Sequence, residues 1–236
     1  MNAASVILQK PDAHRPLAAN ARSELYHMKA NERKQLILER AKHLFSQKGY
    51  YNTQISDIVD DAKIARGTVY QYFKNKDDIF ITLIKNYYND WERYISLEMH
   101  KVDLRTITPV DYLAFRVKHT LQFLANDADL CNIVLRMGIG LSGELETSIK
   151  RFEKKIKNLI VGDLELGIRN NNVRKDIDIE MTGNLITGAL LRVALNHFGN
   201  KKNRRDEAEI DKMTKEIVAV FAPAIFMKKI LNGTRE

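Results

Sequence analysis

Hydrophobic residues recur at steps of three and four along almost the whole chain, which is the spacing that places them on one face of an α-helix. The first clear case ends at Lys48, where Gly49 follows at a position typical of a helix end. We find no convincing strand, internal repeat or low-complexity segment. The pattern predicts an all-α fold, with its longer helices at residues 31–48, 76–100, 109–126, 129–138, 144–170, 178–198 and 206–231.

Two short helices are expected between the first two long ones. Thr53 offers a hydroxyl as the N-cap of a helix beginning near Ile55, and after a tight turn a second helix covers residues 66–73. Two short helices crossing at a steep angle form a helix-turn-helix, whose second helix can enter a DNA major groove about 12 Å wide. The apolar residues expected to hold that angle are Ile55, Ile58, Val59, Ala62, Ile64, Val69 and Phe73.

The most marked break in the pattern lies at residues 106–109. Thr108 can cap a helix and Pro109 suits its first position, so a new domain is expected to begin here. Pro11 and Pro16 keep the beginning of the chain from forming a long helix. We therefore divide the chain into a loosely ordered tail (1–30), a helix-turn-helix domain (31–76), a connecting helix and junction (77–108) and a larger carboxyl-terminal helical domain (109–236).

The net charge is +8 and is concentrated in the helix-turn-helix domain. Residues 33–76 contain nine basic and four acidic side chains, which leaves +5 in 44 residues. Basic proteins favour polyanions, although a charge of this size alone does not separate DNA-binding proteins from many enzymes. Its distribution points to the same segment as the helical pattern.

Other features narrow the class of protein. No segment approaches the run of about 20 apolar residues needed to cross a bilayer, and we recognise no secretion signal, so a cytoplasmic protein without membrane contact is expected. Cys131 is the single cysteine, which excludes an intramolecular disulfide. The six histidines are scattered, so no metal site or cofactor is indicated. No set of titratable residues suggests an enzyme.

One motif is misleading. Residues 138–143 match the G-x-G-x-x-G pattern of dinucleotide-binding proteins, and Asp163 lies 20 residues beyond Gly143. That chemistry requires a strand before the loop, within a β-α-β unit. Because a helix is expected there instead, we interpret the glycines as a connection between helices.

The helix-turn-helix segment resembles the TetR family of bacterial transcription regulators over about residues 31–85. The matching positions are Ala41, Leu44, Phe45, Gly49-Tyr50, Thr53, Asp57-Ile58, Gly67-Thr68-Val69-Tyr70-Gln71-Tyr72-Phe73, Lys76 and Asp77-Asp78. The chain departs from the family at the turn, with Lys63 in place of glycine and Ala65 in place of serine. A left-handed backbone at Lys63 would cost on the order of 1 kcal/mol.

The resemblance implies roles for individual residues at the DNA. Phosphate contacts are implied for Thr53, Gln54, Tyr70, Tyr72 and Lys76. Base contacts are implied for Arg66, Thr68 and Gln71, and Gly67 would allow a close approach of the backbone. Tyr70 and Tyr72 could instead pack on their neighbours, and Lys76 could be a solvated helix end.

The resemblance also implies that residues 109–236 bind a small molecule and form a homodimer through the last two long helices. The expected stripes are Ile179, Leu185, Ile186, Ala189, Leu190, Val193 and Ala194, and Ile210, Met213, Ile217, Val220, Phe221, Ala224 and Ile225. Both stripes could instead belong to the core of the monomer. Pro223 should kink the last helix. Candidates for the effector pocket are Trp91, Tyr94, Phe115, His119, Phe123, Cys131, Arg136 and Met137, although core packing explains each equally well.

The expected function is a repressor that binds a pseudo-palindromic operator as a dimer and is released by a small molecule. The alternative is a DNA-binding protein of the same fold that is controlled by a protein partner or acts architecturally. A cavity in the carboxyl-terminal domain favours the first, and a filled core favours the second.

Overall fold

The computed structural model describes residues 17–136, 140–198 and 206–231, and within these ranges it is helical with no strand beyond an isolated bridge. The amino-terminal helices are α1 (Leu17–Lys48), α2 (Ile55–Ala62), α3 (Arg66–Tyr72) and α4 (Lys76–Met99). The carboxyl-terminal helices are α5 (Pro109–Asn126), α6 (Ala128–Arg136), α7 (Gly143–Arg169), α8 (Ile179–Phe198), α9 (Glu207–Ile225) and α10 (Lys228–Leu231). The all-α fold, with its amino-terminal helix-turn-helix and larger carboxyl-terminal bundle, is confirmed.

The first helix begins earlier than its hydrophobic pattern indicates. It starts at Leu17, so residues 17–30, which were expected in a loosely ordered tail, continue α1. Pro11 and Pro16 do not interrupt this longer helix, because both precede its first residue. The remainder of the expected tail, residues 1–16, lies outside the described residues.

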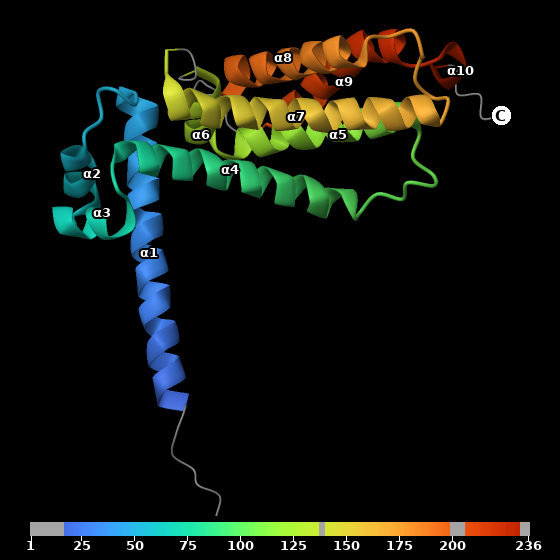
Figure 1. The fold of residues 1–236 in the computed structure, drawn as a ribbon. Coiled ribbons are helices and arrows are strands. Elements are labelled where there is room, and N and C mark those ends of the chain that lie inside the picture. The colour runs from blue at the N-terminus through green and yellow to red at the C-terminus, as the bar shows by residue number, and fades with distance from the viewer. Residues whose placement is uncertain (1–16, 137–139, 199–205, 232–236) are drawn as a thin grey trace, which may run out of the picture.

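The amino-terminal unit is assembled on α1, with α2 and α3 on one side of it and the bundle on the other (Figure 1). At its centre Phe80 packs edge-on against Phe45 and Tyr50, at ring-centroid distances of 5.7 and 5.2 Å. All three side chains are buried. Because Phe80 belongs to α4, this aromatic cluster joins the helix-turn-helix to the helix that leads into the bundle.

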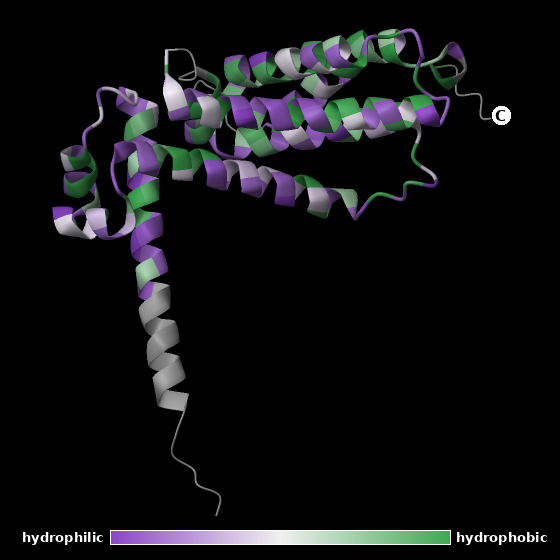
Figure 2. Cartoon of the chain, viewed as in Figure 1, coloured by the Kyte–Doolittle hydropathy of each residue, from purple (hydrophilic) through white to green (hydrophobic). Residues whose placement is uncertain are grey.

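The carboxyl-terminal bundle is formed by α5 to α9, with α4 packed along α5 and α7 (Figure 1). Hydrophobic and hydrophilic positions alternate around these helices, as the amphipathic pattern predicts (Figure 2). The expected start of α5 is confirmed, since Thr108 Oγ1 accepts a hydrogen bond from the Asp111 amide at 3.1 Å and Pro109 follows the cap. None of the helices in the described ranges is long and apolar enough to span a membrane.

The end of the bundle differs from the single helix expected over residues 206–231. Pro223 lies inside α9, which ends two residues later at Ile225, before the short α10. The extended backbone at Phe226 pairs with Val173 as an isolated bridge, and the Arg174 amide donates to the Ile225 carbonyl at 3.0 Å. The helix is therefore interrupted at Phe226, where its main-chain groups form hydrogen bonds with the loop after α7.

The hydrophobic stripes of α8 and α9 do not form two uniform faces. Half of their members are buried in the monomer itself, including Ile186, Leu190, Ile210 and Ile217, so the alternative interpretation holds for these residues. Leu185 and Val220 instead point outward, with 58% and 67% of their surface exposed, and Met181 is exposed on α8 as well. Apolar side chains are therefore exposed on α8 and α9, but they are fewer than the sequence pattern indicated.

Candidate functional site

The turn between α2 and α3 contains a left-handed residue at the expected position, and α3, the second helix of the helix-turn-helix, is called the recognition helix below. Lys63 has φ 52° and ψ 44°, and its amide donates to the Asp60 carbonyl at 3.3 Å. Ala65 occupies the N-cap position of α3 and supplies no side-chain cap, as its substitution for serine implied. Val69 and Phe73 are buried beneath α3 and hold it at its angle to α2.

Replacing Lys63 by glycine should increase the free energy of unfolding by about 1 kcal/mol, because glycine adopts this backbone without a steric penalty. The side chain is exposed and makes no described contact that the substitution would remove. Urea denaturation of the purified protein measures the change, with Lys74→Gly as a control at an exposed position of ordinary backbone. A Lys63→Gly protein no more stable than the wild type would show that the turn stores no strain.

The outer face of α3 presents the side chains expected at base edges. Arg66, Gly67, Tyr70 and Gln71 are exposed, whereas Thr68 and Tyr72 are half-buried. The Arg66 guanidinium donates to the Tyr70 hydroxyl at 3.4 Å and lies 5.8 Å from the centre of its ring. Tyr70 therefore orients the guanidinium of Arg66, which lies one turn before it on the same helix. An oriented guanidinium suits bidentate recognition of a base edge.

Thr53 does not occupy the expected position. Its side chain is fully buried, and its hydroxyl donates to the Gly49 carbonyl at 2.8 Å, so that hydroxyl is not available to a phosphate. The N-cap of α2 is Gln54, whose amide donates to Asp57 Oδ2 at 2.9 Å. The expected capping and phosphate roles of the Thr53 side chain are therefore wrong, because the loop folds back onto the end of α1.

Lys76 packs against the amino-terminal unit of α1, α2 and α3, called the DNA-binding unit below, and is not a solvated helix end. Its ammonium donates to the carbonyls of Tyr50 and Thr53, both at 2.8 Å, and lies 4.2 Å from the centre of the Tyr50 ring. Burial lowers the pKa of Lys76, while neighbouring Asp77 opposes that change. Two of its three donors are thereby occupied, so its main role is to hold the loop between α1 and α2.

A shallow hollow brings several of the expected DNA contacts together at the amino-terminal end of α2. It is lined by Thr53, Gln54, Ile55, Ser56, Arg66 and Lys76. The first amides of a helix carry partial positive charge, and here they lie beside an arginine and a lysine. The hollow thus has the electrostatic character of a phosphate site.

A cavity of about 300 Å³ lies within the bundle, walled by α4, α5, α7, α8 and the end of α9. Most of its wall is apolar. Its members are Trp91, Leu104, Ile107, Thr108, Pro109, Tyr112, Leu113, Arg116, Val117, Thr120, Ile156, Leu159, Ile160, Asp163, Leu164, Leu166, Gly167, Asn170, Asn172, Val173, Ile186, Leu190, Ile225 and Phe226. This volume is at the lower end of those that hold small molecules.

One polar cluster interrupts the apolar wall, formed by Tyr112, Arg116 and Asp163. Arg116 Nε lies 2.9 Å from Asp163 Oδ2, and Arg116 Nη2 donates to Oδ1 at 3.1 Å. The Tyr112 hydroxyl donates to the same carboxylate at 2.9 Å and accepts from Arg116 Nε at 3.0 Å. Burial, together with the charge of Asp163, raises the pKa of Tyr112 to about 12, so its hydroxyl stays neutral at physiological pH.

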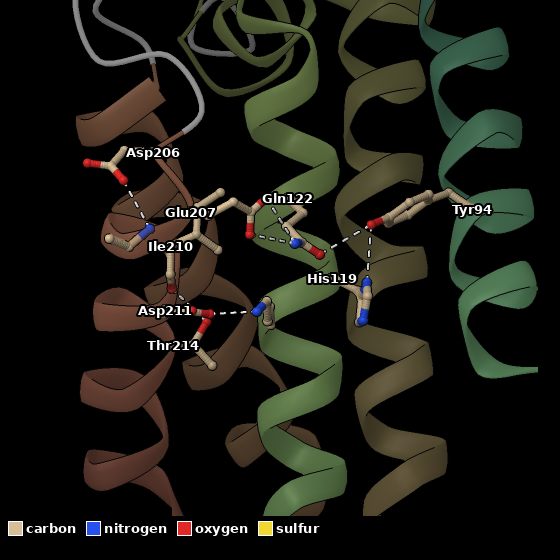
Figure 3. A network of polar contacts seen from close by, with 10 residues as sticks. Tyr94, His119, Gln122, Asp206, Glu207, Ile210, Asp211 and Thr214 are labelled. Atoms are coloured by element: carbon tan, nitrogen blue, oxygen red, sulfur yellow. Dashed lines mark hydrogen bonds and ion pairs between the residues drawn. The ribbon is translucent and has the colours of Figure 1, made fainter. Parts of the chain in front are cut away.

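Of the expected pocket residues whose side chains the structure describes, Trp91 alone lines this cavity. Tyr94 and His119 belong to a separate polar network, in which the Tyr94 hydroxyl lies 3.1 Å from His119 Nδ1 and donates to Gln122 at 3.3 Å (Figure 3). Gln122 in turn donates to Glu207 on α9 at 3.0 Å. These residues join α4, α5 and α9 and do not line this cavity.

The other expected pocket residues are also elsewhere. The Phe115 ring is tilted against that of His119 at 4.2 Å, and Phe123 packs on Tyr87 at 4.8 Å, both between ring centroids. Cys131 is buried in the core, which raises the pKa of its thiol to about 12. The Arg136 side chain and Met137 lie outside the described residues.

The sequence interpretation missed the polar cluster of the cavity. Tyr112 and Arg116 are four residues apart on the helix expected over residues 109–126, which places them on one face and could have identified them as a pair. The sequence pattern drew attention to Asp163 only as part of the dinucleotide-binding motif. In the structure Asp163 lies on α7, and helix α6, not a strand, precedes the glycine-containing loop. Across the described residues, no group of three histidine, cysteine, aspartate or glutamate side chains is placed to hold a metal.

The bundle contacts the DNA-binding unit in several places. Helix α4 extends from Lys76 beneath the recognition helix to Trp91 at the cavity. Near the start of α6, Lys42 Nζ of α1 lies 2.7 Å from Asp127 and the Ser46 hydroxyl donates to Asp129 at 2.7 Å. The Tyr51 hydroxyl also donates to the Gly140 carbonyl at 3.0 Å. A change in the cavity wall therefore has a physical path to the helix-turn-helix.

Comparisons with known proteins identify the family. The sequence pattern of the family described as "Bacterial regulatory proteins, tetR family" matches residues 37–83. The chain is 30% identical over 156 residues to the "Fatty acid metabolism regulator protein" of Bacillus subtilis (strain 168), covering 65% of this chain and 77% of that relative.

Solved structures share the fold. A transcriptional regulator FadR from Bacillus subtilis in complex with stearoyl-CoA superposes with a TM-score of 0.65 at 24% identity, covering 78% of this chain and 97% of that one. A TetR-family transcriptional regulator from Syntrophomonas wolfei gives a TM-score of 0.68 at 25% identity, covering 82% and 96%. This chain belongs to the TetR family of bacterial regulatory proteins and is a DNA-binding, ligand-responsive transcriptional regulator.

Proposed function

We propose that this chain is a cytoplasmic, dimeric repressor that leaves its operator when a small molecule with an apolar acyl chain fills the bundle cavity. The cavity itself is the observation that carries the proposal. Its wall is mostly apolar, and α4 connects it to the recognition helix. The name of the Bacillus subtilis relative, a fatty acid metabolism regulator, supports an acyl effector.

We assign a separate role to each segment of the chain. Residues 31–76 bind DNA, 77–108 connect, and 109–236 bind the effector and the second subunit. At the operator, Arg66, Thr68 and Gln71 face bases, Gly67 permits close approach, and Gln54, Tyr70, Tyr72 and Lys76 lie at phosphates. Two subunits would place their α3 helices about 34–36 Å apart, over successive major grooves of a pseudo-palindrome.

The alternative of a protein-controlled or architectural DNA-binding protein is less well supported. A filled carboxyl-terminal core would favour it, whereas the described residues line a cavity of about 300 Å³. A repressor needs an effector that binds its DNA-free conformation more tightly, with a coupling free energy of about 1–3 kcal/mol. An internal cavity walled by a helix that reaches the DNA-binding unit can provide such coupling.

Fluorescence anisotropy with DNA from upstream of the protein's own gene tests this function. We expect nanomolar binding by at least two subunits, and release on addition of decanoyl-CoA but not of free coenzyme A. Replacing Arg66 and Tyr70 by alanine should weaken operator binding by about 10- to 100-fold, because a bidentate arginine–guanine contact contributes about 1–3 kcal/mol. The residual binding should be sensitive to salt and insensitive to sequence.

The controls separate the two halves of the proposal. A Lys215→Ala protein, altered at an exposed residue of α9, should bind DNA and respond like the wild type. Operator binding that survives saturating decanoyl-CoA would contradict the acyl effector but not DNA recognition. Failure to hold any DNA at low salt, with genomic fragments as well, would contradict the assignment of the recognition helix.

A further inference from the structure

We propose that the Arg116–Asp163 pair makes the cavity selective for an effector with an uncharged carbonyl head, such as an acyl thioester or ester, and against the free acid of the same chain. This inference rests on the proposed function, because it takes the cavity as the effector site. It adds a chemical criterion for the head group and names the residue that imposes it.

The charges of the cavity wall cancel. Among the described residues that line it, Arg116 and Asp163 alone carry formal charge, and they are bound to each other. Their side chains are only 15% and 24% exposed, so water screens the pair weakly. An uncharged ligand therefore meets a wall that is already electrically balanced.

The guanidinium of Arg116 still has donors to offer. Asp163 and Tyr112 occupy its Nε and Nη2 groups, while among the described residues the two N–H groups of Nη1 have no partner. A carbonyl oxygen can accept from such a donor without disturbing the pair. A neutral acceptor in this position gains a hydrogen bond to a charged group, which is stronger than a neutral one.

A carboxylate in the same position meets a different situation. It brings a second negative charge next to Asp163 in a region of weak screening, and like charges at close range repel. To form its own ion pair with Arg116, the ligand carboxylate must displace Asp163, which then remains partly buried without its cation. Leaving a buried charge unpaired is strongly unfavourable, so the pair rejects the free acid.

Tyr112 reinforces this preference. Its hydroxyl donates to Asp163, and its raised pKa of about 12 keeps it protonated, so it holds the carboxylate in place beside Arg116. The apolar residues around the cluster, which include Val117, Leu159 and Ile160, suit the hydrocarbon chain. The cavity thus combines a surface for the chain with a charged hydrogen-bond donor for a carbonyl.

Trp91 provides the measurement, because it lines the cavity and is the single tryptophan of the sequence. Its fluorescence is titrated at pH 7.5 with methyl decanoate, decanoyl-CoA and decanoate. For the wild type we expect both carbonyl probes to bind at least about tenfold more tightly than decanoate. Esters also partition into apolar sites more readily than acids, so the variants decide the cause.

The decisive variant is Asp163→Asn, which leaves Arg116 without its anion. Decanoate should then gain about tenfold in affinity, while methyl decanoate changes little. Asp163→Glu keeps the charge and should keep the wild-type preference, and removing both charges in Arg116→Gln/Asp163→Asn should give decanoate no gain. Asp176→Asn is the matched control, because Asp176 pairs with Arg174 on the exposed surface and does not line the cavity.

The outcomes distinguish this inference from the proposed function. If decanoate binds the wild type as tightly as the ester, or if Asp163→Asn leaves their ratio unchanged, the selectivity of the pair is overturned while the cavity remains an effector site. If no probe alters Trp91 fluorescence in any variant, and none releases DNA, the cavity is not the effector site and both proposals fail. Circular dichroism confirms that each variant is folded.

Discussion

A Leu185→Glu protein should be monomeric and should bind a two-half-site operator about 100- to 10,000-fold more weakly than the wild type. Leu185 is 58% exposed on α8, and Met181 lies one turn earlier on the same surface. A glutamate here would place a charge within the proposed subunit interface, where it has no described cation to pair with. Binding through two linked half-sites exceeds binding through one by about 10² to 10⁴, and a monomer loses that advantage.

Leu97→Glu is the matched control for this change. Leu97 is 59% exposed on α4, so the substitution introduces the same charge on an equally exposed leucine away from α8 and α9. Analytical ultracentrifugation should find a dimer for the wild type and Leu97→Glu, and a monomer for Leu185→Glu. A Leu185→Glu protein that remains dimeric would place the subunit interface on another surface.

Replacing Phe80 by alanine should lower the free energy of unfolding by about 3–5 kcal/mol, which is a large part of the 5–15 kcal/mol available to a typical domain. Phe80 is fully buried and packs edge-on against Phe45 and Tyr50. Truncation removes these contacts and leaves a void where α4 meets the DNA-binding unit. Operator binding should consequently fail at a lower temperature than in the wild type.

Urea denaturation followed by far-ultraviolet circular dichroism measures this loss. Phe115→Ala serves as the comparison, because Phe115 is half-buried on α5 and outside the aromatic cluster, and it should cost about 1 kcal/mol. Equal losses for the two variants would mean that the cluster around Phe80 has no special part in stability.

Local signals made much of this fold predictable. The start of α5 depends on Thr108 and Pro109, which act on their own helix, and the left-handed turn at Lys63 was implied by the glycine that the TetR family usually has at this position. The recognition helix is equally local, because its motif lies within about twenty consecutive residues. In each case the residues that decide the structure are close together in the sequence.

The features that could not be predicted depend on distant segments. The Thr53 hydroxyl binds a main-chain carbonyl at the end of α1, and the sequence does not say that the loop folds back there. The cavity wall draws residues from five helices, so an aromatic residue such as Tyr94 can lie on α4 and still face away from it. Neighbouring Leu185 and Ile186 are both apolar, but only their packing shows which one is buried.

The contacts of α1 with α6 determine what kind of motion the DNA-binding unit can make. With α4 as its only connection it could swivel freely, whereas the contacts of Lys42 and Ser46 near the start of α6, and of Tyr51 with Gly140, restrain it. Its rotation is therefore confined to a limited range. We expect effectors of different chain length to move the recognition helix by different amounts within that range. The response of this regulator would then be graded by the size of the effector, without a separate conformation for each one.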